Sequence, residues 1–278
     1  MEKFRLLSMA IALGVLVGLV LGLTGAGGGI LAVPLLMAGA GWTLPQAAPV
    51  ALIAVSLAAT LGTYIAFQRG WVRYRAALLM GAMGAATAPL GILLAAHLPL
   101  KTLTLIFAGA MLIAAGRLWW QSLEKFVEGS TLLEDGRFAR EQIVRLNPET
   151  GRIVWTLPTL LLVSAIGAFT GVVAGTLGVG GGFILVPALR SATPLTMHSA
   201  VATSLMVIAL ISGSTVVGAL ISGYDYPWLF AAPFAGGAMA GMLAGRAIAP
   251  RIAGPRLQQG FALLMVLIAI GLIFKTSS

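Results

Sequence analysis

Long apolar segments determine what this chain can fold into. Segments such as 4–23, 46–67 and 76–96 carry about 20 predominantly apolar residues, the length that a helix needs to cross a bilayer, and they lack strand-like alternation. Charged residues make up only 9% of the chain, whereas soluble proteins contain roughly a quarter. So few charges cannot cover a globular surface. We therefore expect an all-α polytopic membrane protein.

A glycine-rich motif occurs twice and divides the chain into two homologous halves. The copies GAGGGILAVP (25–34) and GVGGGFILVP (178–187) keep a constant offset between their glycine triplets and between their prolines (187 − 34 = 153). Each copy opens a short apolar segment, at 30–40 or 183–189, that cannot span the bilayer alone. Each half is therefore predicted to contain a glycine-broken helix hairpin and three further transmembrane helices.

These patterns give a complete domain plan. The predicted helices cover residues 4–23, 30–40, 46–67, 76–96, 102–120, 154–177, 183–189, 196–221, 228–249 and 257–274. Residues 1–120 form the first transmembrane repeat and 154–278 the second. The polar segment 121–153 links them, and its turn residues Asn147, Pro148 and Gly151 suggest a small β-hairpin at 143–155.

The placement of basic residues indicates that the two repeats are inverted. After the third helix, the first half carries three arginines and the second half only Asp225. After the fourth helix, the first half carries His97 and Lys101, and the second half carries Arg246, Arg251 and Arg256. Because basic loops face the cytoplasm, equivalent loops lie on opposite sides of the membrane. This assignment makes the linker cytoplasmic and the chain a multi-pass protein of the cell inner membrane, although Lys3 and Arg5 fit it badly.

Several classes of function are not expected from this composition. The chain has no cysteine, and its two histidines lie a hundred residues apart, so we expect no metal and no cofactor. No acid–base or nucleophile pair is visible, which argues against an enzyme. No basic folded module indicates nucleic-acid binding. The surplus of basic residues in the membrane part is typical of lipid anchors, and a smaller share of them would attract an anionic solute.

Two interpretations of the glycine motifs stay open. Small residues allow close helix packing in membranes. Alternatively, each motif breaks a helix at membrane depth, so that the first N–H groups of the short helix and the positive end of its dipole face an anion. The second interpretation assigns backbone contacts with a substrate to Gly27, Gly28, Gly29, Gly180, Gly181 and Gly182.

Neighbouring side chains extend this candidate site. The hydroxyl groups of Thr203, Ser204, Thr24 and Ser56 could donate to an oxyanion, or could bond to their own helix carbonyls. Arg190, Arg246 and His198 are candidates for attracting the anion. The two arginines also suit interfacial anchoring, and the histidine also suits a local hydrogen bond.

The paired motifs and SAVATSL (199–205) resemble the sulfite exporter TauE/SafE family, also called the toluene-sulfonate uptake permeases, over essentially the whole chain. The resemblance implies transport of small sulfur-containing anions such as sulfite, sulfoacetate or other organosulfonates, often outward. In the first half, PVALIAV (49–55) has Leu52 and Ile53 where Thr203 and Ser204 stand, which implies an asymmetric site.

The sequence thus favours a secondary transporter whose partners are a small anion and membrane lipid. Coupling to a proton or another ion stays open, and no oligomeric state is assigned. The alternatives are an anion channel, a transporter of a different small oxyanion, and a membrane anchor or assembly subunit that transports nothing.

Overall fold

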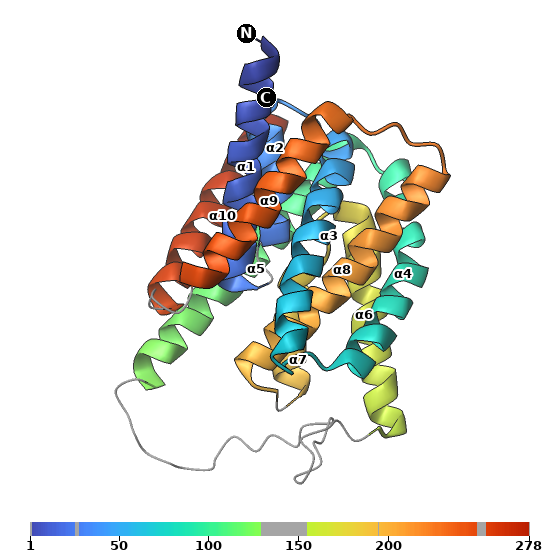
Figure 1. Cartoon of the computed structure of the whole chain (residues 1–278), viewed down its shortest axis with the longest axis vertical. Coiled ribbons are helices and arrows are strands. Elements are labelled where there is room, and N and C mark those ends of the chain that lie inside the picture. Colours follow the sequence, from blue (N-terminus) through green and yellow to red (C-terminus); the bar gives the residue numbers. More distant parts are fainter. Residues whose placement is uncertain (1, 26–27, 129–154, 194, 249–253, 278) are drawn as a thin grey trace.

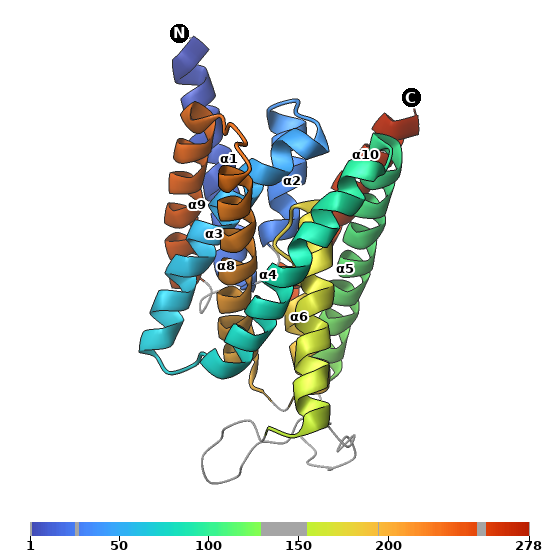
Figure 2. The same ribbon diagram turned by 90° about the vertical axis from the view of Figure 1, so that its right-hand side faces the viewer.

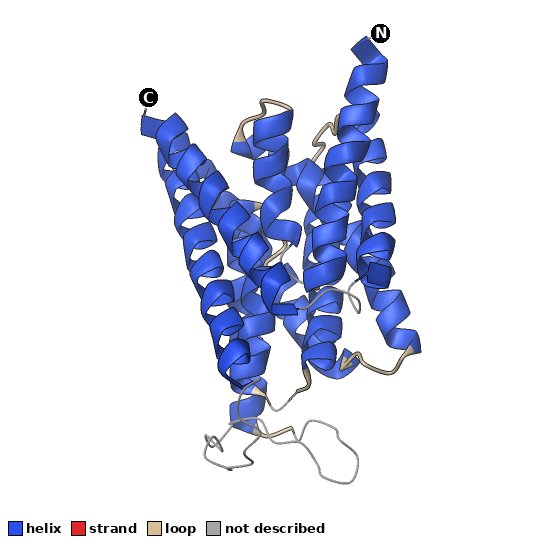
Figure 3. Cartoon of the chain, turned by 90° about the vertical axis from the view of Figure 1, so that its left-hand side faces the viewer, coloured by secondary structure: helices blue, strands red, loops and turns tan. Residues whose placement is uncertain are grey.

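The computed structural model describes residues 2–25, 28–128, 155–193, 195–248 and 254–277. Within these ranges the chain is all-helical, as Figure 3 shows, which confirms the expected fold class. The helices are α1 (Glu2–Thr24), α2 (Gly28–Gly39), α3 (Leu44–Gln68), α4 (Tyr74–His97), α5 (Leu100–Glu128), α6 (Leu157–Leu177), α7 (Gly182–Ala192), α8 (Met197–Ile221), α9 (Trp228–Ile248) and α10 (Gly254–Ser277).

Most of these helices are long enough to cross a membrane. Among the described residues, seven helices are both long and apolar enough, and the two that follow the glycine motifs, α2 and α7, are short. The chain is therefore a multi-pass membrane protein. The first residues of the predicted linker, 121–128, continue α5 as helix. The β-hairpin predicted at 143–155 lies outside the described residues, apart from Trp155.

Matching helix ends identify equivalent positions in the two halves. Thr43 precedes α3 and Thr196 precedes α8 as extended N-cap residues (196 − 43 = 153). The Thr196 hydroxyl accepts from the N–H of Ser199, the usual way to satisfy an orphan donor in the first turn. Gly70 and Gly223 follow α3 and α8 at the same offset. The repeat seen in the motifs therefore extends through α3 and α8.

Each half packs its first helix against the other half. The most extensive contacts join α1 to α9 and α4 to α6, and glycines make both close approaches possible. A Cβ placed on Gly18 would lie 1.9 Å from the carbonyl oxygen of Ala238, and one on Gly171 would lie 2.1 Å from that of Gly84. The small-residue packing interpretation therefore holds for the glycines that precede the motifs.

The two ends of the molecule differ in their connections (Figures 1 and 2). The start of α1 and the end of α10 lie at one end, and the end of α5 and the start of α6 lie at the other, which we call the linker end. The α3–α4 connection lies at the linker end and the α8–α9 connection at the opposite end, and α1 and α6 run in opposite directions. Inversion of the repeats stays a prediction, and these directions support it.

A cysteine-labelling experiment tests the predicted topology. The chain has no cysteine of its own, so Gln68→Cys and Ser222→Cys each introduce a single exposed thiol, at the ends of α3 and α8. We expect an impermeant maleimide to label Ser222→Cys in intact cells and Gln68→Cys only after lysis. Labelling of both from the same side would contradict the inversion.

Candidate functional site at two helix breaks

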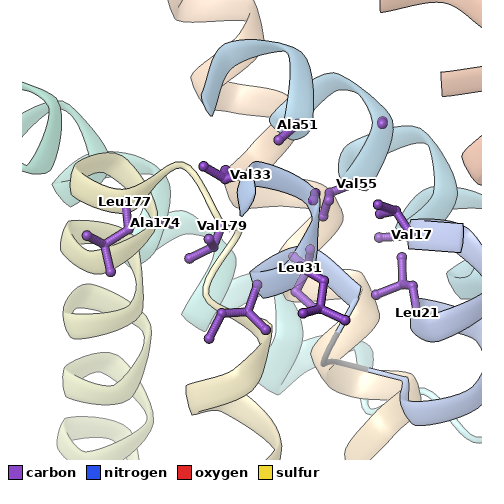
Figure 4. Packing of buried hydrophobic residues seen from close by; sticks show 14 of the residues in the cluster. Val17, Leu21, Leu31, Val33, Ala51, Val55, Ala174, Leu177 and Val179 are labelled. Carbon is purple, nitrogen blue, oxygen red and sulfur yellow. The ribbon is translucent and has the colours of Figure 1, made fainter. Parts of the chain in front are cut away.

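The two glycine breaks meet in the core. A Cβ on Gly29, in the first turn of α2, would lie 2.4 Å from the carbonyl oxygen of Val179, in the break between α6 and α7. Val55 of α3 neighbours both breaks, because its Cγ1 would lie 3.6 Å from a Cβ on Gly29 and 3.2 Å from one on Gly180. Figure 4 shows Val179 and Val55 on either side of the start of α2. Segments far apart in the sequence thus form one site.

Reciprocal contacts hold the breaks in place. A Cβ added to Gly25 would lie 1.9 Å from Cγ1 of Val201 in α8. A Cβ added to Gly178 would lie 2.2 Å from the Cβ of Ala48 in α3. Val201 and Ala48 are equivalent positions (201 − 48 = 153). Each break therefore packs against a helix of the other half.

The second break needs glycine for its conformation. Gly180 and Gly181 have φ angles of 68° and 69°, which residues with a Cβ rarely adopt. A Cβ on Gly181 would also lie 2.2 Å from Cγ2 of Thr170. The motif is thus required by backbone geometry and by lack of space together.

Backbone donors collect at the breaks. The N–H groups of residues 28–30 in the first turn of α2, and of 179–183 around the start of α7, donate to no acceptor among the described residues. These residues are buried, except Phe183, which is half-buried. Unpaired N–H groups at membrane depth cost several kcal/mol each unless they face a polar cavity or a ligand. Both helix N-termini also carry positive dipole ends, so the arrangement suits an anion.

Ser212 is a polar group at the second break that sequence reasoning missed. Its side chain is fully buried, and its Oγ has no hydrogen-bond partner among the residues that the structure describes. A Cβ on Gly180 would lie 2.8 Å from this oxygen. A Cβ added to the neighbouring Gly213 would lie 3.2 Å from the Oγ of Ser56 in α3. The sequence signal was weak, because a serine in an apolar helix usually bonds to its own helix backbone.

Three of the four predicted hydroxyl groups are already engaged. The Thr203 Oγ1 accepts from the N–H of Arg73, at 3.1 Å, and thereby ties the α3–α4 connection to α8. Ser204 donates to the Val201 carbonyl at 2.8 Å, and Thr24 donates to the Val20 carbonyl at 2.9 Å. Local bonding, the alternative weighed for these residues, is what the structure has for Ser204 and Thr24.

The counterparts of Thr203 and Ser204 differ from those expected. The offset that relates Thr43 to Thr196 and Ala48 to Val201 pairs them with Val50 and Ala51 (203 − 153 = 50), in place of Leu52 and Ile53. The pairing of Leu52 and Ile53 with Thr203 and Ser204 is therefore wrong, because the matching starts of α3 and α8 fix the offset at 153 residues. The first half still carries no hydroxyl at either position.

The charged candidates lie at different places. Arg190 is exposed in the last turn of α7, about 12 Å along that helix from the break. His198 is exposed near the start of α8, with its ring 5.1 Å from the ring of Trp71. Arg246 is half-buried in α9 and donates from Nη1 to the carbonyl oxygen of Gly62. Gly27 lies outside the described residues.

A cavity of about 440 Å³ leads to the second break from the end opposite the linker. Gly178 lines the cavity where it meets the break, and Tyr224 and Tyr226 of the α8–α9 connection line the other end of the cavity. The wall is largely apolar and contains no charged side chain. Burial raises the pKa of Tyr226, with a smaller contribution from Tyr224, so its hydroxyl stays protonated and able to donate. The cavity gives a solute a path toward the break.

The Thr203 contact predicts a structural role for this hydroxyl. Replacing Thr203 by Val removes the acceptor of the half-buried Arg73 N–H, so we expect a loss of about 1 kcal/mol in unfolding free energy. Ser204→Ala is the matched control, because its hydroxyl bonds only within its own helix. Unfolding in detergent measures both, and equal stabilities would contradict the assignment.

Comparisons with known proteins agree with this architecture. The sequence pattern described as sulfite exporter TauE/SafE matches residues 10–272. Two relatives from Xylella fastidiosa, strains 9a5c and Temecula1, each named "Probable membrane transporter protein", are 29% and 28% identical over 97% of this chain and 96% of their own length. No solved structure matches. The chain belongs to the sulfite exporter TauE/SafE family of membrane transporters.

Proposed function

We propose that the protein is a secondary transporter that exports small sulfur-containing anions, bound by backbone N–H groups where the two helix breaks meet. The observation that carries this proposal is the set of N–H groups at residues 28–30 and 179–183, for which the described residues supply no acceptor. Two helix N-termini, brought together from both halves, supply donors and positive dipole ends without a fixed charge in the membrane.

The chemistry of sulfite and of sulfonates suits such a site. Each presents three oxygens that accept several hydrogen bonds at once, as backbone N–H groups at helix N-termini provide. Ser212 and Ser56 are the hydroxyl donors we assign, because neither Oγ bonds to a described residue. The apolar cavity beside Gly178 would receive the carbon part of a substrate such as sulfoacetate.

The arrangement favours a carrier over a channel. The described cavity reaches the second break from the end opposite the linker, and at the linker end Arg246 of α9 bonds to the Gly62 carbonyl of α3. A carrier of two inverted repeats opens to one side at a time. We place the linker end in the cytoplasm of the cell and the open end outside the inner membrane. Large unitary currents in a planar bilayer would contradict the carrier.

Ser212→Ala tests the site without disturbing the fold. The hydroxyl donates to none of the described residues, so its removal should leave stability unchanged. The loss of one hydrogen bond to the anion should raise the KM for sulfite about five- to tenfold. Uptake into proteoliposomes measures the KM.

The control is Ser214→Ala, an exposed serine on the same helix whose hydroxyl bonds to the Ile211 carbonyl. Equal KM values for the two variants would refute the role of Ser212. Larger substitutions at Gly181 are less informative, because an added side chain meets Thr170 and perturbs folding as well.

A further inference from the structure

The linker end contains the counterpart of the open cavity. The repeat offset relates Pro45, in the wall of that cavity, to His198 at the linker end (198 − 45 = 153). For α4 and α9 the offset is one residue longer, because Gly84 and Ala238 are the equivalent partners of Gly171 and Gly18 (238 − 84 = 154). Ile92 of the cavity wall therefore corresponds to Arg246.

Side-chain contacts cross this counterpart. Arg246 donates to the carbonyl of Gly62, itself the counterpart of the cavity residue Thr215. Trp71 packs against His198, and the buried residues Ala66, Val72 and Ala202 form a small apolar cluster beside it. These contacts join α3, the α3–α4 connection, α8 and α9 at the linker end.

The counterpart is cationic where the cavity is apolar. Arg246 and His198 stand where the cavity has an isoleucine and a proline, and Arg73 lies at the same end, in the α3–α4 connection. The Nε of Arg73 is buried and has no hydrogen-bond partner among the described residues. Asp225, the one carboxylate whose side chain the structure describes, lies in the α8–α9 connection at the opposite end (Figure 1).

Such arginines require an explanation. A guanidinium cannot lose its proton, and a charge within a transmembrane bundle is costly unless it pairs with another group. Among the described residues Arg246 donates a hydrogen bond to one backbone carbonyl, and no ion pair involves Arg73 or Arg246. A guanidinium presents parallel N–H groups that match two oxygens of an oxyanion. Arginines without an acidic partner among the described residues therefore point to an anionic ligand.

Arg246 is also close to the first break. A Cβ on Gly22, one turn before the break, would lie 3.0 Å from the backbone nitrogen of Arg246, and Gly25 contacts Val201 on α8. An anion that leaves the breaks toward the linker end would thus pass these residues.

We propose that Arg73 and Arg246 form a second anion site at the linker end, where an oxyanion binds when Arg246 releases the Gly62 carbonyl and this end opens. The inference rests on the proposed function, since it adds a binding step on one side of the same transport path. The site takes a sulfite or sulfonate group through its oxygens, and Trp71 and His198 cover it in the closed conformation.

Sided transport kinetics of the full chain test the proposal. Proteoliposomes of known orientation are loaded with sulfite on the linker side or the opposite side, and initial rates give a KM for each. We expect Arg246→Gln and Arg73→Gln each to raise the linker-side KM about tenfold or more, with the opposite-side KM unchanged. Arg246→Lys should restore part of the affinity. The matched control is Arg75→Gln, an exposed arginine two residues from Arg73.

Arg73→Gln keeps the backbone N–H that bonds to Thr203, so this variant retains the contact that ties the α3–α4 connection to α8. Unchanged linker-side KM values in both glutamine variants, with sulfite transport intact, would overturn the second site alone. Absence of sulfite and sulfonate transport by the wild-type protein would overturn the proposed function, and the second site with it.

Discussion

The structure depends on the cost of leaving backbone N–H groups unpaired away from water. A membrane helix satisfies its own backbone except in its first and last turns, and helix ends normally lie at the interface, where water is available. Here α2 and α7 begin inside the bundle, with their first N–H groups buried. This placement is stable only if something polar comes to them. The glycines of both motifs, the contact between Gly29 and Val179 and the isolated hydroxyl of Ser212 are consistent with that single requirement.

Glycine serves two physical purposes along the same segments. In α1 and α6, glycines one turn apart let backbone approach backbone across the two halves, so they act through small size. At Gly180 and Gly181, the positive φ angles make glycine a conformational requirement. Close packing therefore accounts for the glycines of α1 and α6, and backbone conformation accounts for those of the second break, whereas anion binding there stays a proposal.

Much of the fold could be predicted from the sequence, because long apolar segments and a constant offset are properties of the chain alone. The site was predicted less well, since hydroxyl groups were judged by proximity in sequence. Thr203 lies near the second motif in the repeat pattern, yet its oxygen accepts from the α3–α4 connection. Ser212 lies two turns further along α8, and only the fold brings it against Gly180. No sequence pattern gives which face of an apolar helix meets a break in another segment.

The pairing of α1 with α9 and of α6 with α4 has a consequence for biogenesis. The glycine face of α1 is complementary to a helix synthesised more than 200 residues later (228 − 24 = 204). During insertion, the close-packing surfaces of α1 and α4 therefore stay exposed to lipid until the second half has been inserted. The first half cannot reach its native packing alone, and a ribosome that stalls after α5 leaves a chain without a stable bundle. Folding of this transporter is thus a property of the whole polypeptide.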